Sequence, residues 1–149
     1  MAGSTLSAMM AAHKVSVGAI ALLQHPLVEL LIKLRDGSSP CGVALSPDAI
    51  VVDDRNSLVT LTADAHRPSE PFDEGKVLRD YGTVLLQALA QSRQRSLAKI
   101  ARQCADGGID SLNDLYTLLE RRAGNFLYVP LIALITALLA VLWWLNSVN

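Results

Sequence analysis

The feature that most constrains this chain is an uncharged apolar segment near its C-terminus. Every Lys, Arg, Asp and Glu lies at or before Arg122, and residues 126–145 read FLYVPLIALITALLAVLWWL. Twenty residues of helix extend about 30 Å, the thickness of the hydrocarbon core of a bilayer. A core helix of a soluble protein rarely lacks charge over this length, so the segment predicts a transmembrane helix over 126–145.

Aromatic residues flank the predicted span at both ends. Phe126 and Tyr128 lie at its start, and Trp143 and Trp144 lie at its end. Aromatic rings prefer the two membrane interfaces, so we expect these side chains at the level of the lipid headgroups. Pro130 falls near the first turn of the span, where its missing N–H costs little.

Small residues mark one face of the span. Ala133, Ala137 and Ala140 recur at spacings of four and three residues. Small side chains at such spacings let two membrane helices approach closely. The pattern is compatible with a homo-oligomer held by this helix, although alanine is common in any apolar helix.

Basic residues lie on one side of the span only. Arg121 and Arg122 come just before it, and the short tail 146–149 holds none. Cytoplasmic flanks of membrane spans carry an excess of Lys and Arg. The pattern predicts a tail-anchored, single-pass protein whose N-terminal domain faces the cytoplasm.

An apolar stretch over 15–34 leaves two alternatives open. Its start is similar to a signal peptide, but no small-residue cleavage site follows it. A second membrane pass would place His25, Glu29 and Lys33 in lipid, which is costly. We expect instead a helix over 14–35 whose leucines form one apolar face.

The part of the chain before the span has the composition of one small folded domain. Of the 149 residues, 51% are hydrophobic and 18% charged, which argues against disorder. The net charge of −1 argues against nucleic acid as a partner. We expect residues 1–13 to form a flexible or partly helical lead-in and residues 14–122 to form a small helical domain.

One pair of strands interrupts the predicted helices. AIVV at 49–52 and LVTL at 58–61 flank the turn-rich sequence DDRNS, which predicts a β-hairpin. A loop is expected over 63–75. Helices are expected at the following positions: 76–90, 96–104 and from 111 onward. The predicted class is therefore mainly α with one short β-hairpin (α+β), followed by a single transmembrane helix.

Three stretches carry a family resemblance. GVALSPDAIVVDD at 42–54 and VTLTADA at 59–65 resemble the catalytic-loop hairpin of a protein kinase C-lobe. Kinases read roughly His-Arg-Asp-Leu-Lys-Pro-x-Asn-Ile-Leu there, followed by Val-Lys-Leu-x-Asp-Phe-Gly. DYGTVLL at 80–86 is similar to the Ser-Phe-Gly-Val-Leu-Leu helix of that lobe. The resemblance covers roughly residues 15–120 and implies a kinase C-lobe-like fold.

The positions that would carry kinase chemistry hold alanine. The resemblance places Ala44, Ala49 and Ala63 where kinases have the proton-accepting Asp and two Mg²⁺ ligands. Asp64 takes the last position if the hairpin turn is one residue longer. The chain also has no glycine-rich nucleotide loop. The resemblance therefore implies a degenerate, pseudokinase-like lobe that is not an enzyme.

A search that is independent of the resemblance predicts no catalytic, cofactor or metal site. His13, His25 and His66 are scattered, without the spacing of metal ligands. Cys41 and Cys104 are far apart, and a domain in the reducing cytoplasm is expected to keep them as free thiols.

One basic helix face is a candidate interaction surface. Arg95, Lys99 and Arg102 follow an i, i+4, i+7 pattern and share a face. Such a face is either solvated or in contact with anionic lipid or an acidic partner. The solvated face is the more common case, and a tether to the membrane a few residues away is compatible with contact to anionic lipid or an acidic partner.

The sequence thus predicts a non-catalytic, membrane-anchored scaffold or interaction subunit of a larger membrane protein complex. Some bacterial secretion machines contain membrane-anchored pseudokinase-like subunits, and the layout of this chain is similar. That similarity favours a secretion-type complex in a bacterial inner membrane. The expected partners are the other subunits of the complex and the lipid bilayer.

Two alternatives remain at this point. LRDYGTV at 78–84 faintly resembles the groove-forming Asn-Trp-Gly-Arg motif of tail-anchored cell-death regulators of the Bcl-2 type. Its Asn-Trp is missing, however, and a hairpin over 49–61 does not suit an all-helical bundle. A nucleotide-binding enzyme would need a phosphate-binding loop, and the sequence offers none.

Overall fold

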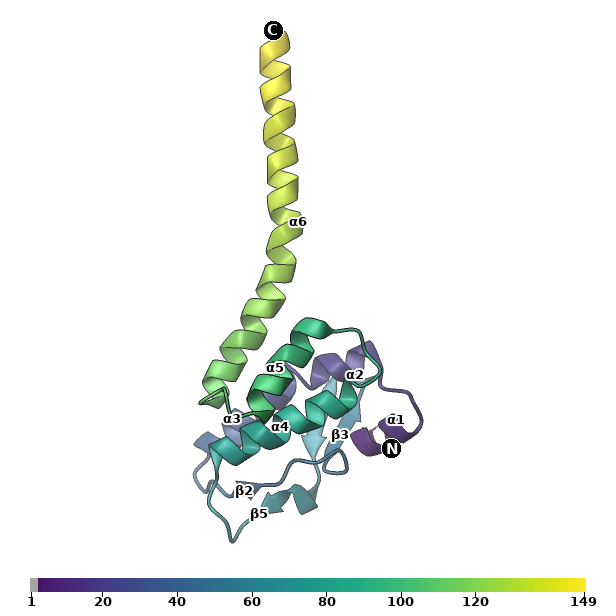
Figure 1. The fold of residues 1–149 in the computed structure, drawn as a ribbon, viewed down its shortest axis with the longest axis vertical. Helices are drawn as coiled ribbons and strands as arrows, with labels where there is room; N and C mark the ends of the chain where they lie inside the picture. The colour runs from purple at the N-terminus through teal and green to yellow at the C-terminus, as the bar shows by residue number, and fades with distance from the viewer. Residues whose placement is uncertain (1–2) are drawn as a thin grey trace.

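Helices dominate the computed structural model, which describes residues 3–149 apart from the side chains of residues 124–129. About 60% of the chain is helical. The elements in chain order are β1 (Ser4–Thr5), α1 (Leu6–Ala11), α2 (Val17–Leu22), α3 (His25–Asp36), β2 (Gly42–Val43), β3 (Ile50–Asp53), β4 (Leu58–Leu61), the 3₁₀ turn η1 (Ala63–Ala65), β5 (His66–Arg67), α4 (Glu74–Ala88), α5 (Arg95–Ala105) and α6 (Leu112–Val148). Figure 1 shows α6 leaving a folded body formed by the other elements.

The predicted hairpin is confirmed. β3 pairs with β4 in antiparallel register, from Ile50 opposite Leu61 to Asp53 opposite Leu58. The Asp53 carboxylate accepts hydrogen bonds from the side chain and the backbone N–H of Asn56, which fixes the turn. These hydrogen bonds also lower the pKa of Asp53. The mainly helical class with a short hairpin is therefore confirmed.

The lead-in over 1–13, expected to be flexible or partly helical, holds a short strand and a helix in its described part. Ser4 and Thr5 pair with Val52 and Val51 as a third strand, which gives the order β1-β3-β4. Helix α1 follows, and its Leu6 is fully buried. The open edge of β3 offers unpaired backbone groups, and the N-terminal strand satisfies them.

The stretch over 15–34 folds as two helices rather than one. The chain breaks between α2 and α3, and Pro26 lies in the first turn of α3, where a proline suits a helix start. At the break, the hydroxyl of Tyr81 donates to the carbonyl of Leu23 over 2.6 Å. Leu27, Val28 and Leu31 of α3 lie in the core. A membrane pass here would remove these side chains from the core.

The expected loop over 63–75 holds more structure than predicted. After η1, β5 pairs with β2, so that Gly42 lies opposite Arg67 and Val43 opposite His66. A side chain at position 42 would come within 2.9 Å of the Cβ of Glu70, so this position requires glycine. A two-residue strand is too short to show a sequence alternation, which is why the pairing was not predicted.

The close contact between α4 and α5 positions the basic helix face. A Cβ at Gly82 of α4 would lie 2.5 Å from the carbonyl oxygen of Ala101 and 2.4 Å from the backbone nitrogen of Ala105. Glycine thus lets the two backbones touch. Leu97, Ala101 and Cys104 face this contact and are buried.

Helix α6 belongs to both the core and the predicted span. Its start is capped by Ser111, and the carboxylate of Glu74 accepts the N–H of Leu112 over 2.6 Å. Leu112, Leu115 and Leu119 are fully buried. The helix then continues without a break to Val148. The sequence placed Pro130 near the first turn of a separate span, but it lies inside this longer helix and removes one internal hydrogen bond.

Candidate membrane-facing surface

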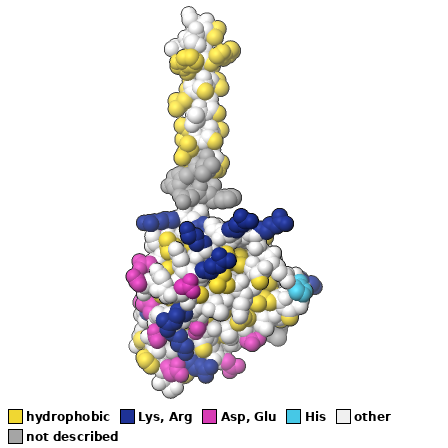
Figure 2. Space-filling view, in the orientation of Figure 1, with side chains coloured by type: hydrophobic (Ala, Val, Ile, Leu, Met, Phe, Trp, Pro, Cys, Tyr) yellow, Lys and Arg dark blue, Asp and Glu magenta, His cyan; other side chains and the backbone are white. Residues whose placement is uncertain are grey.

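The last part of α6 presents an apolar surface to its surroundings. The stretch Pro130–Val148 is long and apolar enough to cross a membrane, and none of its residues is buried. Its large apolar side chains are about half exposed or more, for example 60% for Ile132 and 62% for Leu142. Figure 2 shows apolar side chains along the visible face of the upper part of the helix. Large exposed apolar surfaces are rare in soluble monomers and mark sites of contact with a membrane or another protein.

A second stretch meets the same length and composition criteria but belongs to the core. Val17–Asp36 covers α2 and α3, and 39% of it is buried. The apolar stretch that suggested a second membrane pass is thus accounted for by core packing. An amphipathic core segment of this length passes the same test.

The aromatic residues and alanines that the sequence places in the span are exposed wherever their side chains are described. Trp143 and Trp144 are 73% and 60% exposed near the C-terminal end of α6. The side chains of Phe126 and Tyr128 lie outside the described residues. Ala133, Ala137 and Ala140 are exposed. Contact of this alanine face with a second helix stays a prediction.

The two arginines before the span play different roles. Arg121 is exposed. Arg122 is half-buried, and its guanidinium donates to Ser96 Oγ over 2.8 Å, Gln94 Oε1 over 3.1 Å and Gln24 Oε1 over 3.3 Å. It thereby joins α6 to the start of α5 and to the break between α2 and α3. All three acceptors are neutral, so the positive charge of Arg122 is hydrogen-bonded but not neutralised.

The basic face predicted on α5 is present and lies near Arg122. Arg95, Lys99 and Arg102 are exposed, opposite the buried side of the helix. Among the described residues, both ion pairs belong to Arg35, with Asp36 and Glu74, so none involves this face. Figure 2 shows Lys and Arg side chains gathered at the end of the domain from which α6 leaves, with acidic side chains further away.

The placement of Arg95 is unfavourable for the helix itself. Arg95 is the first residue of α5, and no side chain caps this helix start. The N-terminus of a helix carries partial positive charge, so a cation there costs about 0.3 to 1 kcal/mol. Arg95 therefore does not stabilise α5 through the charge of its side chain.

A hollow lies between the end of α4 and α5. It has a volume of about 450 Å³. Its lining combines two arginines, two small polar residues and an apolar wall: Arg95, Arg102, Ser92, Gln94, Leu86, Leu89, Ala90 and Ala98. We call it the α4–α5 hollow. No carboxylate lines it, so its two charged lining residues are both positive.

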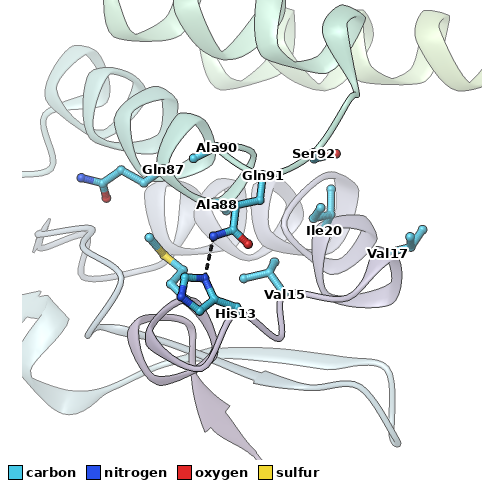
Figure 3. A pocket seen from close by; sticks show the side chains of 10 residues that line it. His13, Val15, Val17, Ile20, Gln87, Ala88, Ala90, Gln91 and Ser92 are labelled. Atoms are coloured by element: carbon cyan, nitrogen blue, oxygen red, sulfur yellow. Dashed lines mark hydrogen bonds between the residues drawn. The ribbon is translucent and has the colours of Figure 1, made fainter.

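A second hollow of about 390 Å³ shares Ala90 and Ser92 with the first in its lining. Figure 3 shows Val15, Val17 and Ile20 along one side and a hydrogen bond of 2.6 Å between Gln91 Nε2 and His13 Nδ1 across it. Its lining is mostly apolar and holds no nucleophile paired with a base.

The positions that would carry kinase chemistry are small side chains in the structure as well. Ala49 is buried, Ala63 is exposed, and neither has a group that binds a metal ion or a proton. Among the described residues, no three His, Cys, Asp or Glu side chains gather as metal ligands. Cys41 and Cys104 are free, as predicted, and burial raises the pKa of Cys104 to about 12.

Comparison with known proteins adds no relative. No family model, no curated protein and no solved structure matches this chain. Its function must therefore be inferred from its own residues.

Sequence reasoning missed the acceptors of Arg122 and the α4–α5 hollow. Gln24, Gln94 and Ser96 are ordinary surface residue types, far from Arg122 in the chain. No periodicity marks them. The basic spacing on α5 was visible, but the wall that α4 adds to it depends on the contact at Gly82.

Proposed function

We propose that this protein is a non-catalytic scaffold or interaction subunit that α6 anchors in a membrane. The observation that carries the proposal is the apolar stretch Pro130–Val148, none of which is buried, in the same helix as the core residues Leu112, Leu115 and Leu119. A membrane span continuous with a core helix holds the domain close to the bilayer. Such a domain is suited to act by contact with other membrane proteins.

The charges support one orientation of this anchor. Arg121, Arg122 and the basic face of α5 lie on the domain side of the span, and no charged side chain follows it. Under the positive-inside rule, the domain would face the cytoplasm. A bacterial inner membrane and a secretion-type complex remain our proposal, which rests on the layout of the chain.

We also propose that the domain is a degenerate kinase-like lobe. The helix α3, the hairpin of β3 and β4, and the helix α4 with Gly82 follow one another in the order that the resemblance implies. The alanines at positions 44, 49 and 63 support the loss of phosphoryl transfer in such a lobe. The Bcl-2-type alternative has less support, because a three-stranded sheet does not suit an all-helical bundle.

The anchor is tested by a charge in the middle of the span. Leu138→Arg places a charge where insertion costs about 3 kcal/mol, whereas Leu138→Ala keeps the segment apolar. We expect the wild type and L138A to stay in the membrane pellet after alkaline carbonate extraction, and L138R to be released. Release of the wild type into the soluble fraction would show that α6 is not an anchor.

Topology and partners need separate measurements. A cysteine introduced as Ser147→Cys should react with an impermeant maleimide from outside intact cells, whereas Cys41 should react only after lysis. Cross-linking in intact membranes should then capture other subunits. A chain that cross-links to nothing and purifies as a lone monomer would contradict the scaffold role.

A further inference from the structure

We propose that the α4–α5 hollow binds the phosphate headgroup of an anionic phospholipid. The proposal rests on the membrane anchor proposed above, because it places the hollow beside a bilayer. It adds a defined lipid site to that anchor, with Arg95 and Arg102 as the ligands of the phosphate.

The lining has the chemistry of a phosphate site. Arg95 and Arg102 are two helical turns apart on one face of α5, so both side chains border the same hollow. Guanidinium groups donate paired hydrogen bonds to phosphate oxygens. Neither arginine has an acidic partner among the described residues, and the hollow holds no carboxylate that would repel an anion. Ser92 adds a hydroxyl at the rim.

The position of the hollow suits a lipid of the same membrane. Gln94, which lines it, accepts a hydrogen bond from Arg122 of α6 over 3.1 Å. Arg122 precedes Pro130 by eight residues, which is about 12 Å along a helix. The headgroup region on each side of a bilayer is several ångströms thick. A headgroup at the surface would therefore lie within reach of the two arginines.

The apolar wall favours a lipid over free phosphate. Leu86, Leu89 and Ala98 line the same hollow as the arginines. Inorganic phosphate gains nothing from such a wall. A phospholipid presents a charged phosphate and an apolar acyl region close together, and this matches a lining that combines two arginines with an apolar wall.

The test measures lipid selectivity of the full chain. The protein is reconstituted in phosphatidylcholine nanodiscs that contain trace spin-labelled phosphatidylglycerol or spin-labelled phosphatidylcholine. Electron paramagnetic resonance then gives the fraction of each lipid that the protein immobilises. We expect the wild type to prefer phosphatidylglycerol by roughly thirtyfold, because each of the two arginines contributes about 1 kcal/mol near anionic lipid and about 1.4 kcal/mol is a factor of ten.

Three variants separate a built site from general charge. Arg95→Gln with Arg102→Gln should abolish the preference. Lys33→Gln with Arg67→Gln removes the same charge from exposed positions that do not line the hollow, and should keep it. Arg95→Lys with Arg102→Lys keeps the charge without the paired donors, and should retain only part of the preference. The lysine variant also gives a result if the glutamine variant does not fold.

Each outcome decides between the proposals. Equal immobilisation of both lipids by an inserted wild type overturns the lipid site and leaves the anchor intact. An equal loss in the two glutamine pairs shows diffuse charge, which also overturns the site. Displacement of the labelled lipid by millimolar inorganic phosphate identifies a free-phosphate site instead. Failure of the wild type to enter neutral nanodiscs overturns the anchor itself.

Discussion

The guanidinium of Arg122 on α6 donates to the hydroxyl of Ser96 at the start of α5 over 2.8 Å. The same group reaches Gln94 and Gln24, so one side chain joins α6, α5 and the break between α2 and α3. It lies one residue after Arg121, which is exposed. Two adjacent arginines with the same place in a charge pattern therefore have different structural roles.

This difference predicts different effects of one substitution at the two positions. Arg122→Gln should lower the free energy of unfolding by about 1 to 2 kcal/mol, because it leaves the acceptors on Gln24, Gln94 and Ser96 without their donor. Arg121→Gln removes the same charge and should cost less than about 0.5 kcal/mol. Thermal unfolding of the full chain in detergent measures both. Equal melting temperatures would show that the network carries no stability.

The backbone contact between α4 and α5 predicts a strong effect at Gly82. Gly82→Ala drives a methyl group against the backbone of Ala101 and Ala105 at 2.5 and 2.4 Å, and backbone cannot rotate away. We expect a loss of about 3 kcal/mol or more in unfolding free energy, measured by denaturant titration.

Gly75 of the same helix is the matched control for Gly82. A Cβ there would meet nothing closer than 3.6 Å. Gly75→Ala should be neutral or stabilise the protein by up to about 1 kcal/mol, because alanine restricts the unfolded chain. Equal destabilisation by the two alanines would show that helix propensity, and not the contact with α5, decides the effect.

The elements with a strong local signal could be predicted from the sequence. The hairpin was visible because two β-branched strands flank DDRNS, and the start of α6 because Ser111 precedes an apolar repeat. The apolar end of α6 was visible from composition alone. Each of these signals lies within a few residues of the element that it predicts.

The features that depend on distant residues could not be predicted. The pairing of β2 with β5 and the acceptors of Arg122 join segments more than twenty residues apart, and no local pattern encodes them. The sequence does not mark the break at Leu23, because the apolar face continues across it. The carbonyl that the break exposes accepts a hydrogen bond from Tyr81 of α4, which is distant in the sequence. The candidate surface shows the same difference. The basic face of α5 could be predicted from the spacing of its residues, whereas the apolar wall of the hollow depends on how α4 packs against α5.

The two cysteines should differ in reactivity. Burial raises the pKa of Cys104 to about 12, whereas Cys41 is half-buried. Only the thiolate reacts with a disulfide reagent. At pH 8 we expect Cys41 to react in the folded protein and Cys104 to react only after unfolding, as followed by absorbance of the released thiol. Rapid reaction of both would contradict the close packing of α5 on α4.

The same burial predicts a decline of stability at alkaline pH. The unfolded chain releases the Cys104 proton near pH 9, and the folded chain keeps it to about pH 12. Unfolding therefore becomes easier as the pH rises above about 9. Cys104→Ala should flatten this decline, whereas Cys41→Ala should not. Burial of Tyr81 raises its pKa too and should leave a residual slope.

The N-terminal segment, expected from its sequence to be a flexible or partly helical lead-in, should contribute to stability. Leu6 is fully buried in the core, with 0% of its surface accessible to solvent. Leu58 at the hairpin is 54% exposed. Leu6→Ala should lower the free energy of unfolding by about 2 to 5 kcal/mol, the usual cost of a buried leucine. Leu58→Ala removes the same atoms from the surface and should cost less than about 1 kcal/mol. Denaturant titration of both variants decides the point, since equal effects would mean that β1 and α1 do not close the core.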